Sequence, residues 1–98
     1  MKAVFISYNQ AHTQQVDFLL DRYRIHGFTR WNSVAGRGSN DGEPHYGSHA
    51  WPGMNTAVLA IVEDEKVPPF LKALRKLDKT AEQQGLRAFV WTVDEEQV

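Results

Sequence analysis

The chain has 98 residues, 42% hydrophobic and 23% charged, a balance typical of one small folded domain rather than a disordered chain. Its formal net charge of −1 gives no general attraction to nucleic acid or acidic membranes, and the absence of cysteine excludes disulfides and thiolate chemistry. No apolar run is long enough for a membrane span or a signal-peptide core. We therefore expect a single domain over residues 1–98, with a mature cytoplasmic start and no membrane insertion.

The first half of the chain predicts a strand, a helix and a second strand. Residues 2–8 are β-rich and almost continuously apolar, as in a buried strand. Asn9 can cap a following helix, and Gly27 suits the end of that helix. The apolar stripe of the helix consists of Val16, Leu19, Leu20 and Tyr23. Residues 28–34 then predict the second strand.

The second half predicts a strand, a helix and a last strand. Residues 55–62 are apolar at nearly every position. Pro68 and Pro69 fit the first turn of a helix, where a missing N–H group matters little. The stripe of that helix consists of Phe70, Leu71, Leu74 and Leu77. With a final strand over residues 86–93, the order β-α-β-β-α-β predicts an α+β, ferredoxin-like plait: a four-stranded antiparallel sheet with two helices on one face.

The strands carry apolar residues on both faces, although two helices can cover only one. Residues 3–6, 57–62 and 88–91 contain almost no alternating polar positions. A strand with one face in water should alternate, so the second face needs a cover. We expect other copies of the chain to provide it, because large exposed apolar patches mark interfaces.

Residues 35–53 form a nineteen-residue connection between two strands that should be neighbours. Loops this long in a small domain are usually functional or mobile, and both readings stay open here. Gly36, Arg37 and Gly38 could bring backbone N–H groups and a guanidinium to a phosphate or carboxylate. Tyr46 and Trp51 are unusual in a purely flexible insert and could contact a partner protein.

Two further features suggest ligands. His45 and His49 have a spacing used in metal sites, and Glu43 could add a third ligand for a divalent metal. Arg87 lies in apolar sequence at the start of the last strand, where it could hold an anion or simply reach water. No nucleophile motif or carboxylate pair is present, so we expect a binding or signalling module rather than an enzyme.

The whole chain resembles the PII signal-transduction proteins and their PII-like relatives. Gly27 opens the second strand, Gly36 and Arg37 follow it, and a long loop similar to the family's T-loop leads to the third strand. Residues 85–90 have the glycine, basic residue and apolar strand that close the family's core. Residues 80–87 lack the glycines and the aspartate of its phosphate-binding segment, so we expect a divergent PII-like protein.

The resemblance implies a homotrimer that binds small effectors, often adenine nucleotides, in clefts between subunits. By position, Gly36 and Arg37 match the T-loop base that helps to hold the nucleotide, and Arg87 matches a lysine that contacts phosphate. The loop over residues 36–53 would signal to a target transporter or enzyme, with no role for nucleic acid. The alternative is a trimeric divalent-metal-binding protein that uses His45 and His49.

Overall fold

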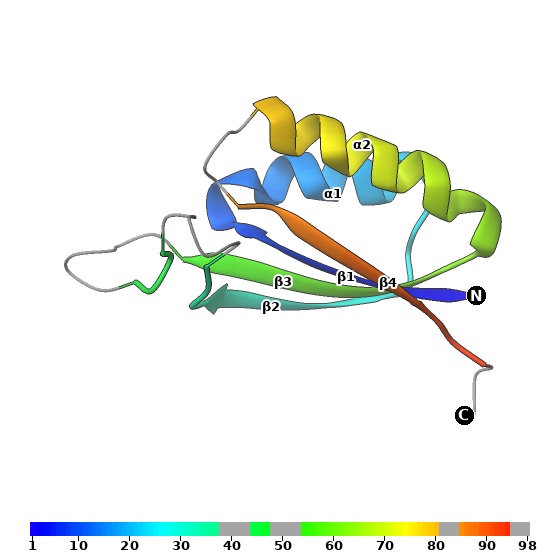
Figure 1. Cartoon of the computed structure of the whole chain (residues 1–98), viewed down its shortest axis with the longest axis horizontal. Helices are drawn as coiled ribbons and strands as arrows, with labels where there is room; N and C mark the ends of the chain where they lie inside the picture. The colour runs from blue at the N-terminus through cyan, green and yellow to red at the C-terminus, as the bar shows by residue number, and fades with distance from the viewer. Residues whose placement is uncertain (38–43, 48–53, 81–84, 95–98) are drawn as a thin grey trace.

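Four antiparallel strands form one sheet, and two helices cover one of its faces (Figure 1). The computed structural model describes residues 1–37, 44–47, 54–80 and 85–94. Its elements are β1 (Lys2–Asn9), η1 (Gln10–His12), α1 (Thr13–Arg22), β2 (Phe28–Val34), β3 (Asn55–Val62), η2 (Asp64–Lys66), α2 (Val67–Thr80) and β4 (Arg87–Thr92). The spatial order of the strands is β2-β3-β1-β4, which confirms the ferredoxin-like arrangement.

The core lies between the sheet and the helices. On β1, alternate residues Val4, Ile6 and Tyr8 are fully buried against the helix layer. The helices meet them with the buried residues of their predicted stripes, which are Val16, Leu20, Phe70 and Leu74. This burial of apolar area supplies most of the driving force for folding. None of the described helices is long and apolar enough to cross a membrane.

The start of the first helix agrees with the sequence, but its end does not. The Asn9 side chain accepts a hydrogen bond from the N–H of Ala11 at 2.8 Å, and it caps a short 3₁₀ turn that leads into α1. The helix ends at Arg22, and Arg24 takes the left-handed conformation with φ 54°. Its turn is closed by a hydrogen bond from the N–H of Ile25 to the carbonyl of Leu20. Arg24 therefore occupies the position usually taken by glycine, and the expectation that Gly27 stops this helix was wrong.

A bulge near the end of β2 precedes the long loop. The pairing of β2 with β3 shifts register between Trp31 and Val34. Within this interval Ser33 has a positive φ of 57°, which is uncommon for a residue other than glycine. Bulges bend a strand and increase its twist. The bulge therefore changes the direction of β2 just before the long loop begins.

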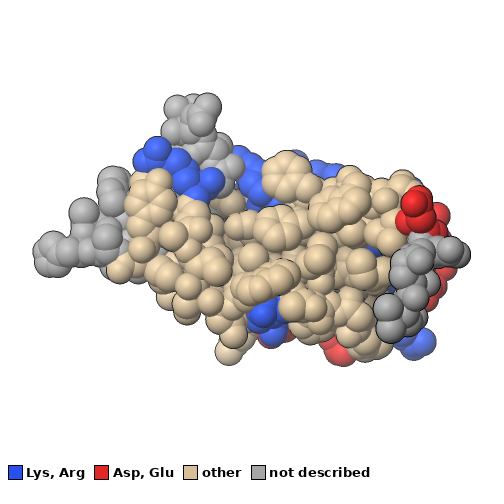
Figure 2. All heavy atoms as spheres, turned by 90° about the horizontal axis from the view of Figure 1, so that it is seen from below, with Lys and Arg blue, Asp and Glu red and all other residues tan. Residues whose placement is uncertain are grey.

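The face of the sheet opposite the helices is apolar and open in the single chain. Phe5 of β1 lies between Leu59 of β3 and Phe89 of β4, and Ala3 lies between Ile61 and Trp91. Residues directly opposite one another share a face, so these two rows form one surface. Figure 2 shows that this face is largely free of charged side chains, which lie toward its margins. Its partly exposed large side chains include Trp31, Ile61, Phe89 and Trp91.

Candidate functional site: the base of the long loop

Backbone hydrogen bonds join the start of the long loop to His45 in its middle. The N–H of Gly36 donates to the carbonyl of His45 at 2.8 Å, and the N–H of His45 donates to the carbonyl of Gly36 at 2.6 Å. This antiparallel bridge is isolated from the β2–β3 pairing, which ends with Val34 opposite Asn55. The loop therefore has a defined base. Gly38, His49 and Trp51 lie outside the described residues.

Side chains fix this base to the sheet. His45 is buried, and its Nδ1 lies 2.6 Å from Oδ1 of Asn55, the first residue of β3. Nδ2 of Asn55 in turn donates to Oγ of Ser7 on β1 at 3.3 Å. Asn55 is only 2% exposed, so its amide is a buried polar connection between the loop and two strands.

The backbone of Gly36 lies against the same amide. A Cβ atom at Gly36 would come within 2.5 Å of Nδ2 of Asn55, too close for an undisturbed side chain. A side chain at Gly36 would therefore displace the Asn55 amide that contacts His45. The sequence singled out Gly36 and His45 but not Asn55. The available signal was a polar residue at the start of a strand that is otherwise almost entirely apolar.

The return leg of the loop presents Tyr46 to solvent. Tyr46 is 47% exposed, and the following Gly47 has a left-handed φ of 67°. The backbone of Gly47 packs so closely on Met54 that a Cβ atom would meet its sulfur at 2.1 Å. The carbonyl of Met54 accepts from the N–H of Gln10 at 2.9 Å, which ties this leg to the turn after β1. Tyr46 is therefore placed on an anchored segment, with its ring available for contact.

Arg87 begins β4 at the same end of the sheet, opposite Ser7 in the pairing of β1 with β4. Its Nη1 donates to the carbonyl of Leu86 at 2.8 Å and lies 3.7 Å from Oδ2 of Asp78 on α2. The Arg87 side chain is 42% exposed in the single chain. Arg87 is therefore a partly exposed cation at this end of the sheet, paired with Asp78.

Arg37 and Arg87 lie at opposite edges of the sheet. Arg37 is exposed and follows β2, whereas Arg87 starts β4, and both strands are edge strands in the order β2-β3-β1-β4. Three strand spacings of about 4.8 Å, or roughly 14 Å, separate two such edges. One phosphate group spans far less than that. In a single chain the two arginines therefore lie next to strands at opposite edges of the sheet.

The geometry of His45 gives the metal alternative no support. Its Nδ1 is engaged with Asn55, and its imidazole is 3% exposed. Among the described residues no group of three or more His, Asp or Glu side chains is placed to hold a metal ion. Glu43 and His49, the other candidates for that site, lie outside the described ranges.

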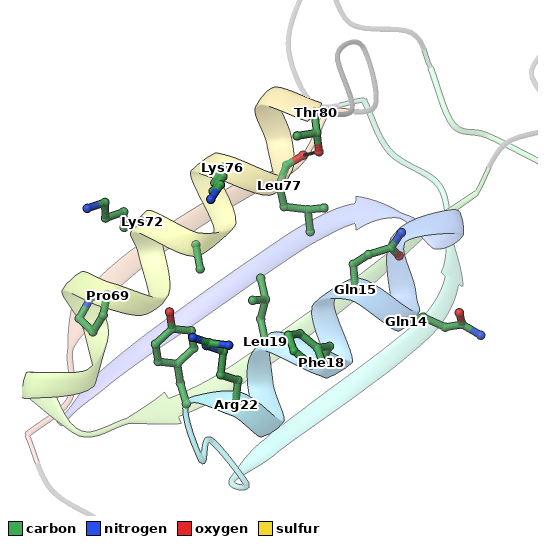
Figure 3. A pocket seen from close by; sticks show the side chains of 12 residues that line it. Gln14, Gln15, Phe18, Leu19, Arg22, Pro69, Lys72, Lys76, Leu77 and Thr80 are labelled. Carbon is green, nitrogen blue, oxygen red and sulfur yellow. Dashed lines mark hydrogen bonds between the residues drawn. The ribbon is translucent and has the colours of Figure 1, made fainter.

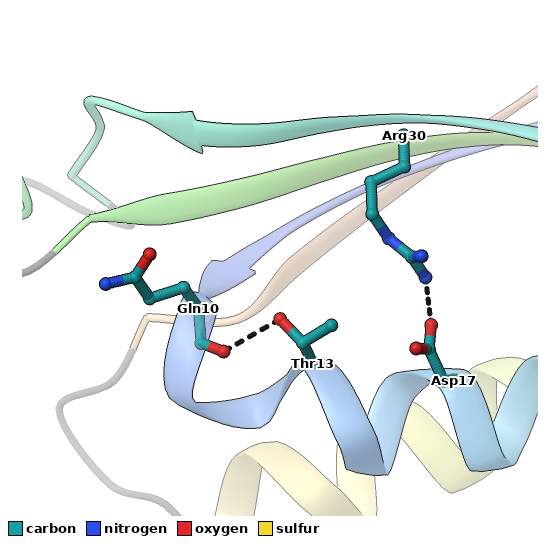
Figure 4. A network of polar contacts seen from close by, with 4 residues as sticks. All are labelled: Gln10, Thr13, Asp17 and Arg30. Carbon is teal, nitrogen blue, oxygen red and sulfur yellow. Dashed lines mark hydrogen bonds and ion pairs between the residues drawn. The ribbon is translucent and has the colours of Figure 1, made fainter.

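A second polar cluster lies between β2 and α1. The guanidinium of Arg30 forms an ion pair with Asp17, and Thr13 Oγ1 donates to the carbonyl of Gln10 at 2.7 Å (Figure 4). The hydroxyl of Tyr8 is buried nearby and, among the residues that the structure describes, meets no hydrogen-bond partner within bonding geometry. Burial raises the pKa of Tyr8 above its usual value of 10.0, and the neighbouring Arg30 opposes that shift. Arg30 and Asp17 pair with each other at the edge of the core, where the Asp17 side chain is 46% exposed, so we assign this cluster a structural role.

Comparison with known proteins places this chain in one family. The family model described as Nitrogen regulatory protein P-II matches residues 1–98. The chain therefore belongs to the P-II family, and its fold is that of the PII-like proteins. A comparison with curated proteins found no matching sequence.

Solved structures agree with this assignment. The CPII protein of Thiomonas intermedia, a nitrogen regulatory PII-like protein solved with ADP, AMP and bicarbonate, has a TM-score of 0.74 and 24% identity over 92% of this chain and 82% of its own. Its apo form has a TM-score of 0.71 and 21% identity over 92% and 85% of the two chains. A protein of Thermus thermophilus described as PII-like and signaling has a TM-score of 0.66 and 21% identity over 92% and 83%.

Proposed function

We propose that this protein is a small-molecule-responsive PII-like regulator rather than an enzyme. It binds an anionic or adenine-nucleotide effector in clefts between subunits and signals through the loop over residues 36–53. The observation that carries this proposal is the position of Arg37 and Arg87, at the same end of the sheet but on opposite edges. A neighbouring copy that sets its β2 edge beside β4 would bring the two residues together.

The apolar sheet face supports the assembly that such a cleft needs. Phe89 is 60% exposed in the single chain and lies in one row with Phe5 and Leu59. Contiguous apolar surface of this kind is typical of interfaces between subunits. P-II family proteins are typically homotrimers, and we infer the same assembly here.

The loop base supports ligand binding at its mouth. Gly36, Arg37 and Gly38 would offer backbone N–H groups and a planar guanidinium to a phosphate or carboxylate. The solved CPII structures hold ADP, AMP and bicarbonate, which are ligands of this chemistry. Because the base is anchored through His45 and Asn55, a ligand that orders residues near Arg37 would change how the loop presents Tyr46 and Trp51. A target transporter or enzyme would read that change.

Calorimetry with ADP, AMP and bicarbonate tests the proposal. Arg37→Ala and Arg87→Ala should each weaken the bound ligand about tenfold or more, since one charge-assisted hydrogen bond contributes roughly 1.5–3 kcal/mol. Arg37→Lys should restore only part of the affinity, because the planar fork is lost. Arg75→Ala is the matched control, since Arg75 is an exposed arginine on α2 away from the loop base.

Two results would overturn the proposal. One is wild-type affinity in both arginine variants, and the other is the absence of binding of all three ligands to the assembled protein. A divalent metal that binds the wild type and is lost in His45→Ala and His49→Ala, with no effect of the arginine changes, would favour the metal-binding alternative.

A further inference from the structure

A groove runs along the outer side of the helix layer, between α1 and α2. Its volume is about 830 Å³, and it is open to solvent. Leu19 of α1 and Leu77 of α2 point toward one another across it, and Phe18 lies at its side (Figure 3). None of these residues belongs to the loop base or to the apolar sheet face, so the groove is separate from the site described above.

The groove combines an apolar floor with a positively charged rim. Phe18 is 62% exposed, the largest exposed fraction among the large hydrophobic side chains of the described residues. Three cations line the groove, Arg22 from α1 and Lys72 and Lys76 from α2. No Asp or Glu is among its described lining residues, although the whole chain has a net charge of −1. The positive rim is therefore a local feature.

We propose that this groove is a docking site for an acidic amphipathic helix of a partner protein. The lining residues extend from Gln14 to Tyr23 on α1 and from Pro69 to Thr80 on α2. At 1.5 Å per residue these segments span roughly 14 and 17 Å, which is room for about three turns of a third helix. Apolar residues at helical spacing would fill the floor, and flanking Asp or Glu would pair with the rim.

The charges argue against other occupants. A second copy docking through the same groove would set Arg22, Lys72 and Lys76 against their own kind, which is unfavourable. The groove is also open along its length, unlike the enclosed cavities that bury most of a small apolar ligand. A partner helix of opposite charge, with one face in the groove and the other in solvent, fits both properties.

The test uses two synthetic fourteen-residue peptides with the same leucine spacing, one carrying Glu and the other Lys at the flanking positions. Fluorescence anisotropy should detect binding of the Glu peptide and at least tenfold weaker binding of the Lys peptide. The double change Lys72→Glu with Lys76→Glu should reverse this preference. The matched control, Arg75→Glu with Lys79→Glu, changes two cations of the same helix that do not line the groove.

A third variant, Phe18→Ser, should weaken the Glu peptide about tenfold while leaving the helical circular dichroism and the molecular mass unchanged. The inference fails if neither peptide binds at millimolar concentration, if both bind equally, or if the control pair acts like the groove pair. It also fails if Phe18→Ser lowers the molecular mass, which would assign the groove to a second copy. Tighter binding to phosphatidylglycerol vesicles than to the Glu peptide, through the same lysines, would assign it to a membrane.

Discussion

His45 and Asn55 join the return leg of the long loop to the first residue of β3, with 2.6 Å between Nδ1 and Oδ1. Both side chains are buried, and the backbone of His45 is at the same time paired with Gly36. These contacts fix the base of the loop to the sheet. Arg37 directly follows Gly36, so the ligand that we propose for Arg37 would bind beside this base.

Asn55→Ala should loosen the loop base and destabilise the protein. It leaves the imidazole of His45 buried without its partner, and an unsatisfied buried polar group costs about 1–3 kcal/mol. Urea unfolding should show the loss, and amide exchange should become faster at Gly36 and His45. Asn32→Ala, which removes an exposed amide from β2, is the control and should have little effect. Equal stability of the two variants would contradict the structural role of Asn55.

Arg24→Gly should stabilise the protein by about 0.5–1 kcal/mol, because glycine adopts the left-handed conformation without the steric penalty that arginine has there. Thermal unfolding should show a higher Tm. Gln15→Gly is the opposite control, since glycine inside an exposed helix turn costs roughly 1 kcal/mol. A lower Tm for Arg24→Gly would mean that the arginine side chain contributes more than the backbone strain removes.

The stability of the protein should fall as the pH rises above about 10, and Tyr8 should account for part of that fall. The folded state holds the pKa of Tyr8 above 10.0 by burial, so the unfolded chain loses this proton first and unfolding becomes more favourable. Tyr8→Phe should flatten the decline between pH 10 and the raised pKa. Tyr46→Phe, which alters an exposed ring, should keep the wild-type slope. Identical slopes in the wild type and Tyr8→Phe would refute this assignment.

Phe89→Glu should separate the subunits of the assembled protein, since it places a charge on the apolar sheet face. Phe18→Glu is a close control because Phe18 is 62% and Phe89 60% exposed, but Phe18 lies on the helix side. Light scattering after size exclusion should show a lower mass for the first variant alone. A wild-type protein with the mass of one 11.2 kDa chain at micromolar concentration would contradict the inferred assembly.

The bounds of the strands could be predicted from the sequence because residues that disfavour strands lie next to their ends. The bounds of β2 and β3 match the prediction, since the glycine- and proline-rich loop separates two segments rich in β-branched and aromatic residues. The end of α1 was predicted wrongly because Arg24 adopts the left-handed backbone conformation, which a sequence-based prediction expects at glycine. In that turn, the hydrogen bonds and the burial of Ile25 outweigh the local preference.

The candidate site could be predicted only in part from the sequence. Gly36 and His45 were singled out for ligand chemistry, yet the structure first gives them a packing role against Asn55. That partner is ten residues away from His45 in the chain, and only the return of the loop to the sheet brings it near. Arg37 and Arg87 were expected to face one ligand from different segments or different subunits, and that stays a prediction. Their separation depends on the spatial order of the strands, which no local pattern records.

The strand order β2-β3-β1-β4 puts the strands beside the two arginines at opposite edges of the sheet, and we propose that their shared ligand site forms between two chains. Any effector held by both would bind only where two chains meet, so its occupancy and the association of subunits would be one linked equilibrium. Dilution of the protein would then lower apparent affinity, and added effector would hold subunits together. The response of such a regulator would depend on its own abundance in the cell as well as on the abundance of its ligand.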